Sequence, residues 1–179
     1  MKKNRIILRN HVDDDFSGNY LNWLVDSDVM EHTDTHVKKF SHDELKLYAK
    51  NEKEKGNIFL AVEDVETGEH IGNLKIYNIS ADEDCKSAEY SRFIGEKNFW
   101  GRGYGTELGL LAIEYCFNNL HLDKVLAGCR FENKKAIISN LKIGFEIEGV
   151  KFYKAENYQG EAKSLIFSIT KEQFFQKKT

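Results

Sequence analysis

The sequence predicts a mixed α/β domain with helices on both faces of one mixed sheet, and three observations support this. Of 179 residues, 41% are hydrophobic and 31% are charged, as in ordinary globular proteins. Short apolar runs bounded by turn residues alternate with longer stretches of helical periodicity. Their predicted order is β-α-α-β-β-β-α-β-α-β-β, which combines hairpins with two strand–helix–strand units. Because the length suits one domain, we expect residues 1–179 to form a single unit.

The N-terminal part is expected to hold one strand, at residues 5–10, and two helices. The acidic run Asp13 to Asp15 should open the first helix, since carboxylates favour the positive end of the helix dipole. The second helix should begin at a capping box that runs from Ser41 to Glu44. The apolar residues of the first helix recur at helical spacing and predict one core-facing stripe: Phe16, Tyr20, Trp23 and Leu24.

Later elements follow from turn signals and apolar patterns. Residues 58–65 and 71–79 should form a hairpin, and residues 88–95 the next strand. A glycine-rich turn at 101–105 should lead into a long helix that ends near Asn119. A strand at 125–129 and a helix at 133–143 come next, and Gly144 is expected to end that helix in the left-handed conformation. Strands near 145–155 and 162–169 complete the sheet.

Composition excludes several classes of protein. The net charge of -3 argues against a general nucleic-acid binder, which would usually carry a basic face. Cys85, Cys116 and Cys129 are odd in number and lack C-x-x-C spacing, so we expect free thiols in a reducing compartment. The apolar runs are too short for a signal peptide or a membrane span. We therefore expect a cytoplasmic protein that binds no metal, nucleic acid or membrane and that is a monomer or a homodimer.

The glycine-rich turn predicts an anion site. The first N–H groups of a helix have no internal acceptor, and the helix dipole is positive there. Glycines at 101, 103 and 105 would let a phosphate approach the main chain. The spacing matches neither a P-loop nor a dinucleotide-binding fingerprint. A tight turn that simply needs glycine is the alternative interpretation.

Residues 94–107, IGEKNFWGRGYGTE, resemble the acyl-coenzyme-A motif of the GNAT superfamily of N-acetyltransferases. More narrowly, they resemble its ribosomal-protein-alanine acetyltransferase branch. Asn133-x-x-Ala136-Ile137 and Lys142-x-Gly144-Phe145 resemble the second signature of the superfamily. The resemblance implies a largely antiparallel sheet of six to seven strands. It also implies an enzyme that transfers an acetyl group directly from acetyl-CoA to a primary amine.

The same resemblance implies how acetyl-CoA is bound. Its pyrophosphate would lie on the main-chain amides at the start of the long helix, and its pantetheine arm would run beside the 88–95 strand like an added strand. The N–H near Ile94 would polarise the thioester carbonyl. For Lys135 alone, a solvated helix lysine is the alternative. The implied cofactor-binding residues are Phe93, Ile94, Gly95, Arg102, Gly103, Tyr104, Gly105, Thr106, Asn133, Lys135 and Asn140.

Two catalytic residues are expected. Asn140 occupies the position where many family members have a tyrosine that protonates the leaving thiolate. An amide cannot supply that proton, although it can donate a hydrogen bond to sulfur. Glu89 is the candidate general base, acting on the amine through ordered water. It shares a strand face with Ser91 and Phe93, and a surface glutamate in a cross-strand pair is the alternative.

The acceptor pocket is expected to include His32, Asp34, His36 and Tyr77. A metal site at the two histidines and Asp34 is a minor alternative. Residues 20–29 and 72–75 resemble family members that acetylate nucleotide-linked amino sugars. A protein N-terminus, a polyamine and an amino-sugar antibiotic are the other acceptors that remain open. A domain that only binds acyl-CoA as a sensor is the non-enzymatic alternative.

Overall fold

The computed structural model describes residues 4–34, 37–82, 84–155 and 160–176. In these residues seven strands form one sheet, in the spatial order β1-β2-β3-β4-β5-β7-β6. The strands are β1 (Ile6–Arg9), β2 (Ile58–Asp64), β3 (His70–Ser80), β4 (Ser87–Ile94), β5 (Lys124–Arg130), β6 (Glu146–Tyr153) and β7 (Ala162–Thr170). Only the β4–β5 pair is parallel. The predicted fold class, a mixed and largely antiparallel sheet of six to seven strands with helices, is confirmed.

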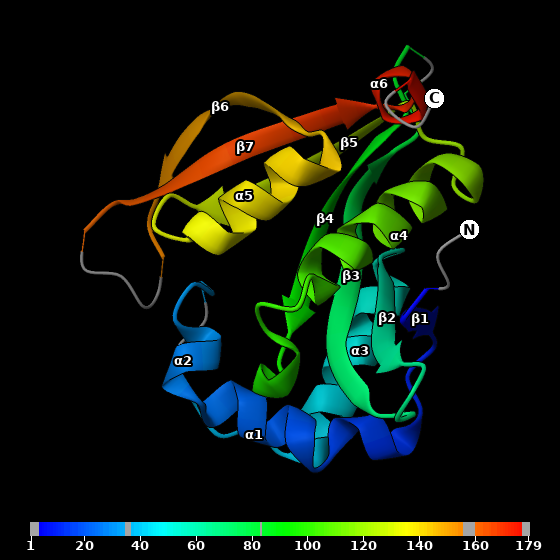
Figure 1. The fold of residues 1–179 in the computed structure, drawn as a ribbon. Helices are drawn as coiled ribbons and strands as arrows, with labels where there is room; N and C mark the ends of the chain where they lie inside the picture. The colour runs from blue at the N-terminus through cyan, green and yellow to red at the C-terminus, as the bar shows by residue number, and fades with distance from the viewer. Residues whose placement is uncertain (1–3, 35–36, 83, 156–159, 177–179) are drawn as a thin grey trace.

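Helices cover both faces of this sheet (Figure 1). The long helix α4 and the helix α5 lie on the near face in that view, and α3 lies on the far face behind β2. The helices are α1 (Asn19–Val25), α2 (Ser27–Met30), α3 (His42–Glu54), α4 (Tyr104–Asn118), α5 (Lys134–Ile143) and α6 (Lys171–Gln176). Two 3-10 helices are η1 (Asp13–Phe16) and η2 (Lys97–Phe99).

The parallel strands β4 and β5 separate halfway along their length. They pair only from Ser87 with Lys124 to Tyr90 with Ala127. Beyond Tyr90, β4 continues to Ile94 without pairing with β5, whereas β5 stays paired with β7 as far as Arg130. A gap therefore opens at the carboxyl ends of the two strands, and it exposes backbone N–H and C=O groups that no neighbouring strand uses.

The first predicted helix is interrupted, so that prediction was wrong in one respect. The chain forms η1 and then α1, with a break at Ser17 and Gly18. Gly18 has φ +52° and ψ -118°, a positive-φ conformation that glycine adopts far more readily than other residues. The short helices α2 and α6 were also not predicted. Asp26 caps α2 through hydrogen bonds from the N–H groups of Asp28 and Val29.

The helix ends that carried clear signals form as expected. The Ser41 side chain accepts from the Glu44 N–H, and the Glu44 side chain accepts from the Ser41 N–H, which completes the predicted capping box. Gly144 follows α5 with φ +112°, so its left-handed cap is confirmed.

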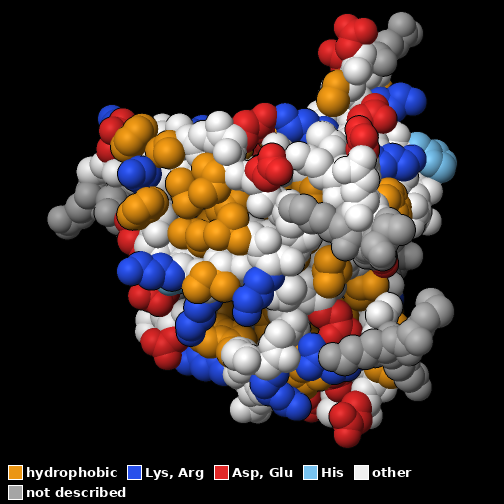
Figure 2. All heavy atoms as spheres, turned by 45° about the horizontal axis from the view of Figure 1, so that its top comes forward, with side chains coloured by type: hydrophobic (Ala, Val, Ile, Leu, Met, Phe, Trp, Pro, Cys, Tyr) orange, Lys and Arg blue, Asp and Glu red, His pale blue; other side chains and the backbone are white. Residues whose placement is uncertain are grey.

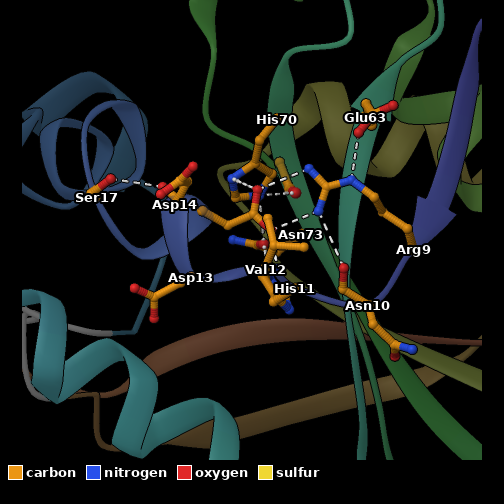
Figure 3. Close-up of polar contacts among 12 residues, drawn as sticks. Arg9, Asn10, His11, Val12, Asp13, Asp14, Ser17, Glu63, His70 and Asn73 are labelled. Carbon is orange, nitrogen blue, oxygen red and sulfur yellow. Dashed lines mark hydrogen bonds and ion pairs between the residues drawn. The ribbon is translucent and has the colours of Figure 1, made fainter.

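Polar side chains join the N-terminal segment to the sheet (Figure 3). Arg9 on β1 donates to Glu63 on β2 at 2.5 Å and to both carboxylate oxygens of Asp15, at 2.6 and 2.9 Å. Burial alone would raise the pKa of Asp15, but the Arg9 hydrogen bonds and the Val12 N–H outweigh it and lower that pKa. The acidic run lies in the first turn of η1, as expected, and Asp15 accepts a hydrogen bond from the Val12 N–H at that helix start in addition to its buried ion pair with Arg9.

The opposite edge of the sheet ends in β6, most of whose residues are exposed. Large hydrophobic side chains of β6 and α5 reach the surface, among them Ile138, Ile147 and Phe152. Figure 2 shows hydrophobic side chains gathered toward the left, the side on which α5 and β6 lie in Figure 1. In the described residues, no helix combines the length and the hydrophobicity that a membrane span requires.

Candidate active site

A cleft of about 990 Å³ opens where β4 and β5 separate. Its walls come from β3, β4, β5 and α5, and from the N-terminal segments α1 to α3. Seven of the residues predicted from sequence line this one cleft: His32, Asp34, Tyr77, Glu89, Phe93, Asn133 and Asn140. The first and the last of them, His32 and Asn140, are more than 100 positions apart in the sequence. The fold thus brings the predicted acceptor residues, the candidate base and part of the predicted cofactor set to one place.

Glu89 lies on the wall formed by β3 and β4. It is the direct cross-strand partner of Tyr77, and its Oε1 accepts a hydrogen bond of 2.8 Å from Asn78 Nδ2. Burial, together with the nearby Glu89 charge, raises the pKa of Tyr77 to about 12, so its hydroxyl keeps its proton at neutral pH. Glu89 has no cationic partner in the part of the chain that the structure describes.

Asn140 lies on the α5 wall and is almost fully buried. Its Oδ1 accepts a hydrogen bond of 2.7 Å from Arg92 Nη2. The same guanidinium donates through Nη1 to the hydroxyl of Tyr90. Because Oδ1 is occupied by Arg92, the Nδ2 group is the part of the amide that can donate to a ligand.

Asp34, predicted to bind the acceptor, already accepts hydrogen bonds from two other residues of the protein. Arg130 on β5 donates to its Oδ1 at 3.0 Å, and the Tyr153 hydroxyl on β6 donates to the same atom at 2.8 Å. His32 also lines the cleft, and its Nε2 lies 3.5 Å from a carboxylate oxygen of Glu31. The predicted acceptor residue His36 is outside the described residues. Within those residues no cluster of His, Cys, Asp and Glu side chains could hold a metal ion.

The predicted anion site lies at the start of α4. Gly103, with φ +86°, is the N-cap residue, and no side chain caps the first amides. A Cβ built at Gly105 would meet no atom within 4 Å, so the space beside this turn is open. Arg102 and Thr106 flank this position, and the Thr106 hydroxyl bonds Ser139 of α5 at 2.8 Å. The Thr106 N–H already donates to the Gly103 carbonyl at 3.1 Å, so within the described residues the turn leaves the Tyr104 and Gly105 amides, beside open space, for an anion.

Tyr104, predicted among the cofactor residues, is buried and donates its hydroxyl to Asp64 at 2.9 Å. Its side chain therefore helps to anchor α4 to β2, and only its main chain faces the turn. A second anchor joins the same helix to the N-terminal segment. The Arg5 N–H and Nε donate to the two carboxylate oxygens of Glu107, at 2.6 and 2.7 Å.

The exposed edge of β4 leads from the cleft toward this turn. Gly95 N–H donates to Ile71 on the β3 side, whereas the Ile94 carbonyl accepts 2.8 Å from Trp100 Nε1. Successive strand residues direct their main-chain groups to opposite edges, so the Ile94 N–H faces the gap. Lys135 Nζ lies 5.5 Å from the centroid of the Trp100 ring, which places this lysine beside the same edge.

The cysteines are free, as predicted. Burial raises the pKa of the Cys116 thiol to about 12 and that of Cys129, which lines the cleft, to about 11. Both are therefore protonated at neutral pH and are poor nucleophiles.

Several cleft residues were not predicted. Arg92 lies on the face of β4 that α4 and α5 cover. From the sequence alone, a charged residue at this position only breaks the pattern of core-facing apolar residues. Arg130 and Tyr153 meet Asp34 across 96 and 119 positions of sequence. Trp100 lies at the glycine-rich turn, outside the cleft lining, and its hydrogen bond to the Ile94 carbonyl follows only from the path of the chain. No local spacing indicates such pairs.

The comparisons with known proteins agree with this geometry. Residues 5–146 match the model of the acetyltransferase (GNAT) domain family. A spermidine N-acetyltransferase from Vibrio cholerae, solved with CoA and spermine, superposes with a TM-score of 0.83 at 21% identity, over 97% of this chain and 99% of that chain. A GNAT-family acetyltransferase from Bacillus anthracis gives a TM-score of 0.76 at 20% identity, over 96% and 98%.

The family match covers most of the chain and includes β4, β5 and the glycine-rich turn. The chain therefore belongs to the GNAT acetyltransferase family and is an enzyme that uses acetyl-CoA as its acetyl donor.

Proposed function

We propose that the protein acetylates a primary amine of a small molecule by direct attack on acetyl-CoA within the β4–β5 cleft. The observation that carries this proposal is that Glu89 and Asn140 line one cleft at the point where the two strands separate. Glu89 would accept the amine proton through ordered water, because a carboxylate is a much weaker base than an amine. Asn140 would donate a hydrogen bond to the sulfur through its Nδ2 group.

Acetyl-CoA supplies the activated acetyl group, and the residues present fit it. The uncapped start of α4 and the open space at Gly105 suit the pyrophosphate. Ile94, between Phe93 and Gly95, turns its main-chain N–H toward the gap and would meet the pantetheine arm there. The Ile94 N–H would then donate to the thioester carbonyl, where negative charge develops during transfer. Asn133 and Lys135 flank the arm from the start of α5.

The charges of the cleft favour an acceptor that carries an anionic group. Among the described residues, five basic side chains and two carboxylates line the cleft: Lys38, Lys75, Arg92, Arg130 and Lys151 against Asp34 and Glu89. Glu52 pairs with Lys75 at 2.8 Å, and Asp34 pairs with Arg130. The remaining charges are mostly positive. A nucleotide-linked amino sugar, which offers one amine and a diphosphate, fits this balance.

A polyamine is the second candidate acceptor, and the likeness to the spermidine acetyltransferase structures supports it. A flexible polycation would place its second amine among the same lysines and arginines, which opposes binding. A protein N-terminus, the acceptor of the ribosomal-protein-alanine branch, is the third. The three free thiols agree with a reducing compartment such as the cytoplasm.

The test is the release of thiol from acetyl-CoA in the presence of amino-sugar nucleotides, spermidine, spermine and short peptides. We expect the highest kcat/KM with an amino-sugar nucleotide, and a lower value for the same sugar without its diphosphate. A preference for spermidine would favour the polyamine alternative. Binding of acetyl-CoA without turnover on any acceptor would instead favour the acyl-CoA sensor.

A further inference from the structure

Arg92 is held between the sheet and the two helices that cover it. Its guanidinium donates in two directions, to the Tyr90 hydroxyl and, at 2.7 Å, to Asn140 Oδ1. Tyr90 is itself fixed, because it is buried and its ring stacks on Phe145 with centroids 5.8 Å apart. Both ends of the guanidinium are thus oriented by residues of the core.

Helix α4 leaves room for this guanidinium at Gly109. A Cβ at that position would overlap Arg92 Nη1 and Ile143 Cδ1. Gly109 lies in the middle of α4, where glycine makes a helix less stable than alanine does. The close approach of Arg92 accounts for a glycine there.

Arg92 also lacks a counter-ion. In the described residues no carboxylate pairs with it, whereas Lys75 and Arg130 of the same cleft pair with Glu52 and Asp34. Arg92 nevertheless lines the cleft beside Asn140. A partly buried guanidinium without an anion favours any negative charge that develops nearby.

We propose that Arg92 is a positioning residue that stabilises the thiolate of the leaving coenzyme A. This inference rests on the proposed function, which places the thioester sulfur beside Asn140. Arg92 fixes the Asn140 amide so that Nδ2 donates to sulfur, and its positive charge favours the anionic form of that sulfur. The amine nitrogen bonds to the carbonyl carbon, the carbon–sulfur bond breaks, and sulfur leaves with the electron pair. The amine proton passes through water toward Glu89.

This arrangement replaces proton donation by charge stabilisation. The leaving group departs as a thiolate, and no side chain has to protonate it during the transfer step. A neutral asparagine is sufficient at position 140 because the charge is supplied one hydrogen bond away.

The pKa of bound coenzyme A measures this effect without any acceptor. Thiolate formation in the complex is followed by ultraviolet absorbance against pH, with the complex of desulfo-coenzyme A as the blank. The free value is measured on coenzyme A alone, and an opposite charge within about 4–6 Å lowers a pKa by roughly 1–3 units. We expect the bound thiol to titrate at least about one unit below its free value.

Arg92→Gln should return the thiol pKa to its free value. Arg92→Lys keeps the charge but loses the fork to Tyr90 and Asn140, so it should give an intermediate value. Gly109→Ala displaces the guanidinium from the helix side and should raise the thiol pKa with Arg92 still present. Lys142→Gln is the matched control, since it removes an exposed charge of α5 and should leave the pKa of the bound thiol unchanged.

The outcomes separate this inference from the proposed function. Failure of the wild-type protein to bind coenzyme A would contradict both. Tight binding with the same thiol pKa in the wild type and in a folded Arg92→Gln variant would overturn the role of Arg92 alone. If Arg92→Gln does not fold, equal thiol pKa values in the wild type, Arg92→Lys and Gly109→Ala proteins would overturn it.

Discussion

The guanidinium of Arg130 on β5 pairs with Asp34 at 3.0 Å and so ties the N-terminal wall of the cleft to the central sheet. Only 7% of the Arg130 side chain is exposed, whereas 56% of Asp34 is, so the sheet residue holds the loop residue in place. The Tyr153 hydroxyl strengthens this contact from β6. Acceptor binding should therefore depend on residues that do not themselves meet the amine.

Arg130→Gln should weaken acceptor binding more than acetyl-CoA binding. A hydrogen bond to a charged group contributes about 1.5–3 kcal/mol, so we expect the KM for the acceptor to rise about tenfold or more. Steady-state kinetics with each substrate varied in turn would measure both values. Lys163→Gln is the control, because it removes a positive charge from neighbouring β7 outside the cleft lining and should leave the acceptor KM unchanged. An unchanged acceptor KM in a folded Arg130→Gln protein would show that Asp34 does not shape the acceptor site.

Gly105→Val should abolish tight coenzyme A binding while the protein stays folded. The backbone of Gly105 does not have a positive φ, and a Cβ built there has no neighbour within 4 Å, so the added side chain would occupy the place of the phosphate rather than disturb the core. Calorimetry of coenzyme A binding is the measurement. Gly149→Val on β6 is the matched control, because a Cβ there also meets nothing within 4 Å. Equal affinity in the two variants would contradict the phosphate site.

The cysteines should be dispensable for turnover. Because burial raises the pKa of Cys116 to about 12 and of Cys129 to about 11, neither thiol forms a thiolate at neutral pH. A Cys116→Ala, Cys129→Ala double variant should keep kcat within a few-fold while its Tm falls, since both side chains fill the interior. Mass spectrometry that detects an acetylated cysteine during turnover would contradict direct transfer.

The free energy of unfolding should decrease in mild acid because of His70, the first residue of β3, and His11, which lies against β3. Burial lowers the pKa of His11 and of His70, and both rings bond Asn73 Oδ1, at 2.8 and 3.0 Å. The folded state therefore disfavours their protonation. Their contribution is present above the ordinary histidine pKa near 6.5 and is lost as pH falls below it toward the folded values. The lowered pKa of Asp15 acts separately, at pH below about 4.

Urea denaturation at neutral pH and in mild acid would measure this loss. His11→Gln, which keeps a donor for Asn73, should make the free energy of unfolding less dependent on pH in that range. His121→Asn changes an exposed histidine and serves as the control. If the wild type and His11→Gln lose the same free energy on acidification, the buried histidines are not responsible.

Local patterns account for the parts of the fold that were predicted correctly. The Ser41 capping box, the glycine at 144 and the alternation along β4 each depend on residues a few positions apart, so they can be recognised in one sequence. The break at Gly18 was missed because Phe16 before it and Tyr20, Trp23 and Leu24 after it keep helical spacing across the break. There the ion pair between Arg9 and Asp15 fixes η1 separately from α1.

The candidate site was predictable only in part, for the same reason. Positions relative to a motif were enough to select Glu89 and Asn140 as candidates, and both line the cleft. Arg92 could not, because a cation on the core-facing side of a strand acquires a meaning only when Tyr90, Gly109 and Asn140 are placed around it. Long-range partners of this kind are set by packing rather than by spacing.

The role of Glu89 is the central chemical claim, and its side chain offers an isosteric test. Glu89→Gln keeps the shape and the bond to Asn78 but removes basicity. General-base help contributes about 10²–10⁴ in rate, so kcat should fall by roughly that factor at neutral pH. It should recover partly at high pH, as free amine becomes abundant, and acetyl-CoA affinity should stay unchanged. Glu66→Gln, in the exposed β2–β3 turn, should leave kcat as it is.

The most direct measurement is the dependence of kcat on pH for the wild type and for Glu89→Gln with the best acceptor. We predict a deficit of at least about a hundredfold near neutrality that narrows as pH rises. A kcat within about threefold of the wild type at neutral pH, well below that range, would contradict the account. Glu89 would then be a structural residue of β4, and the proton would have to pass to another group of the cleft, such as His32.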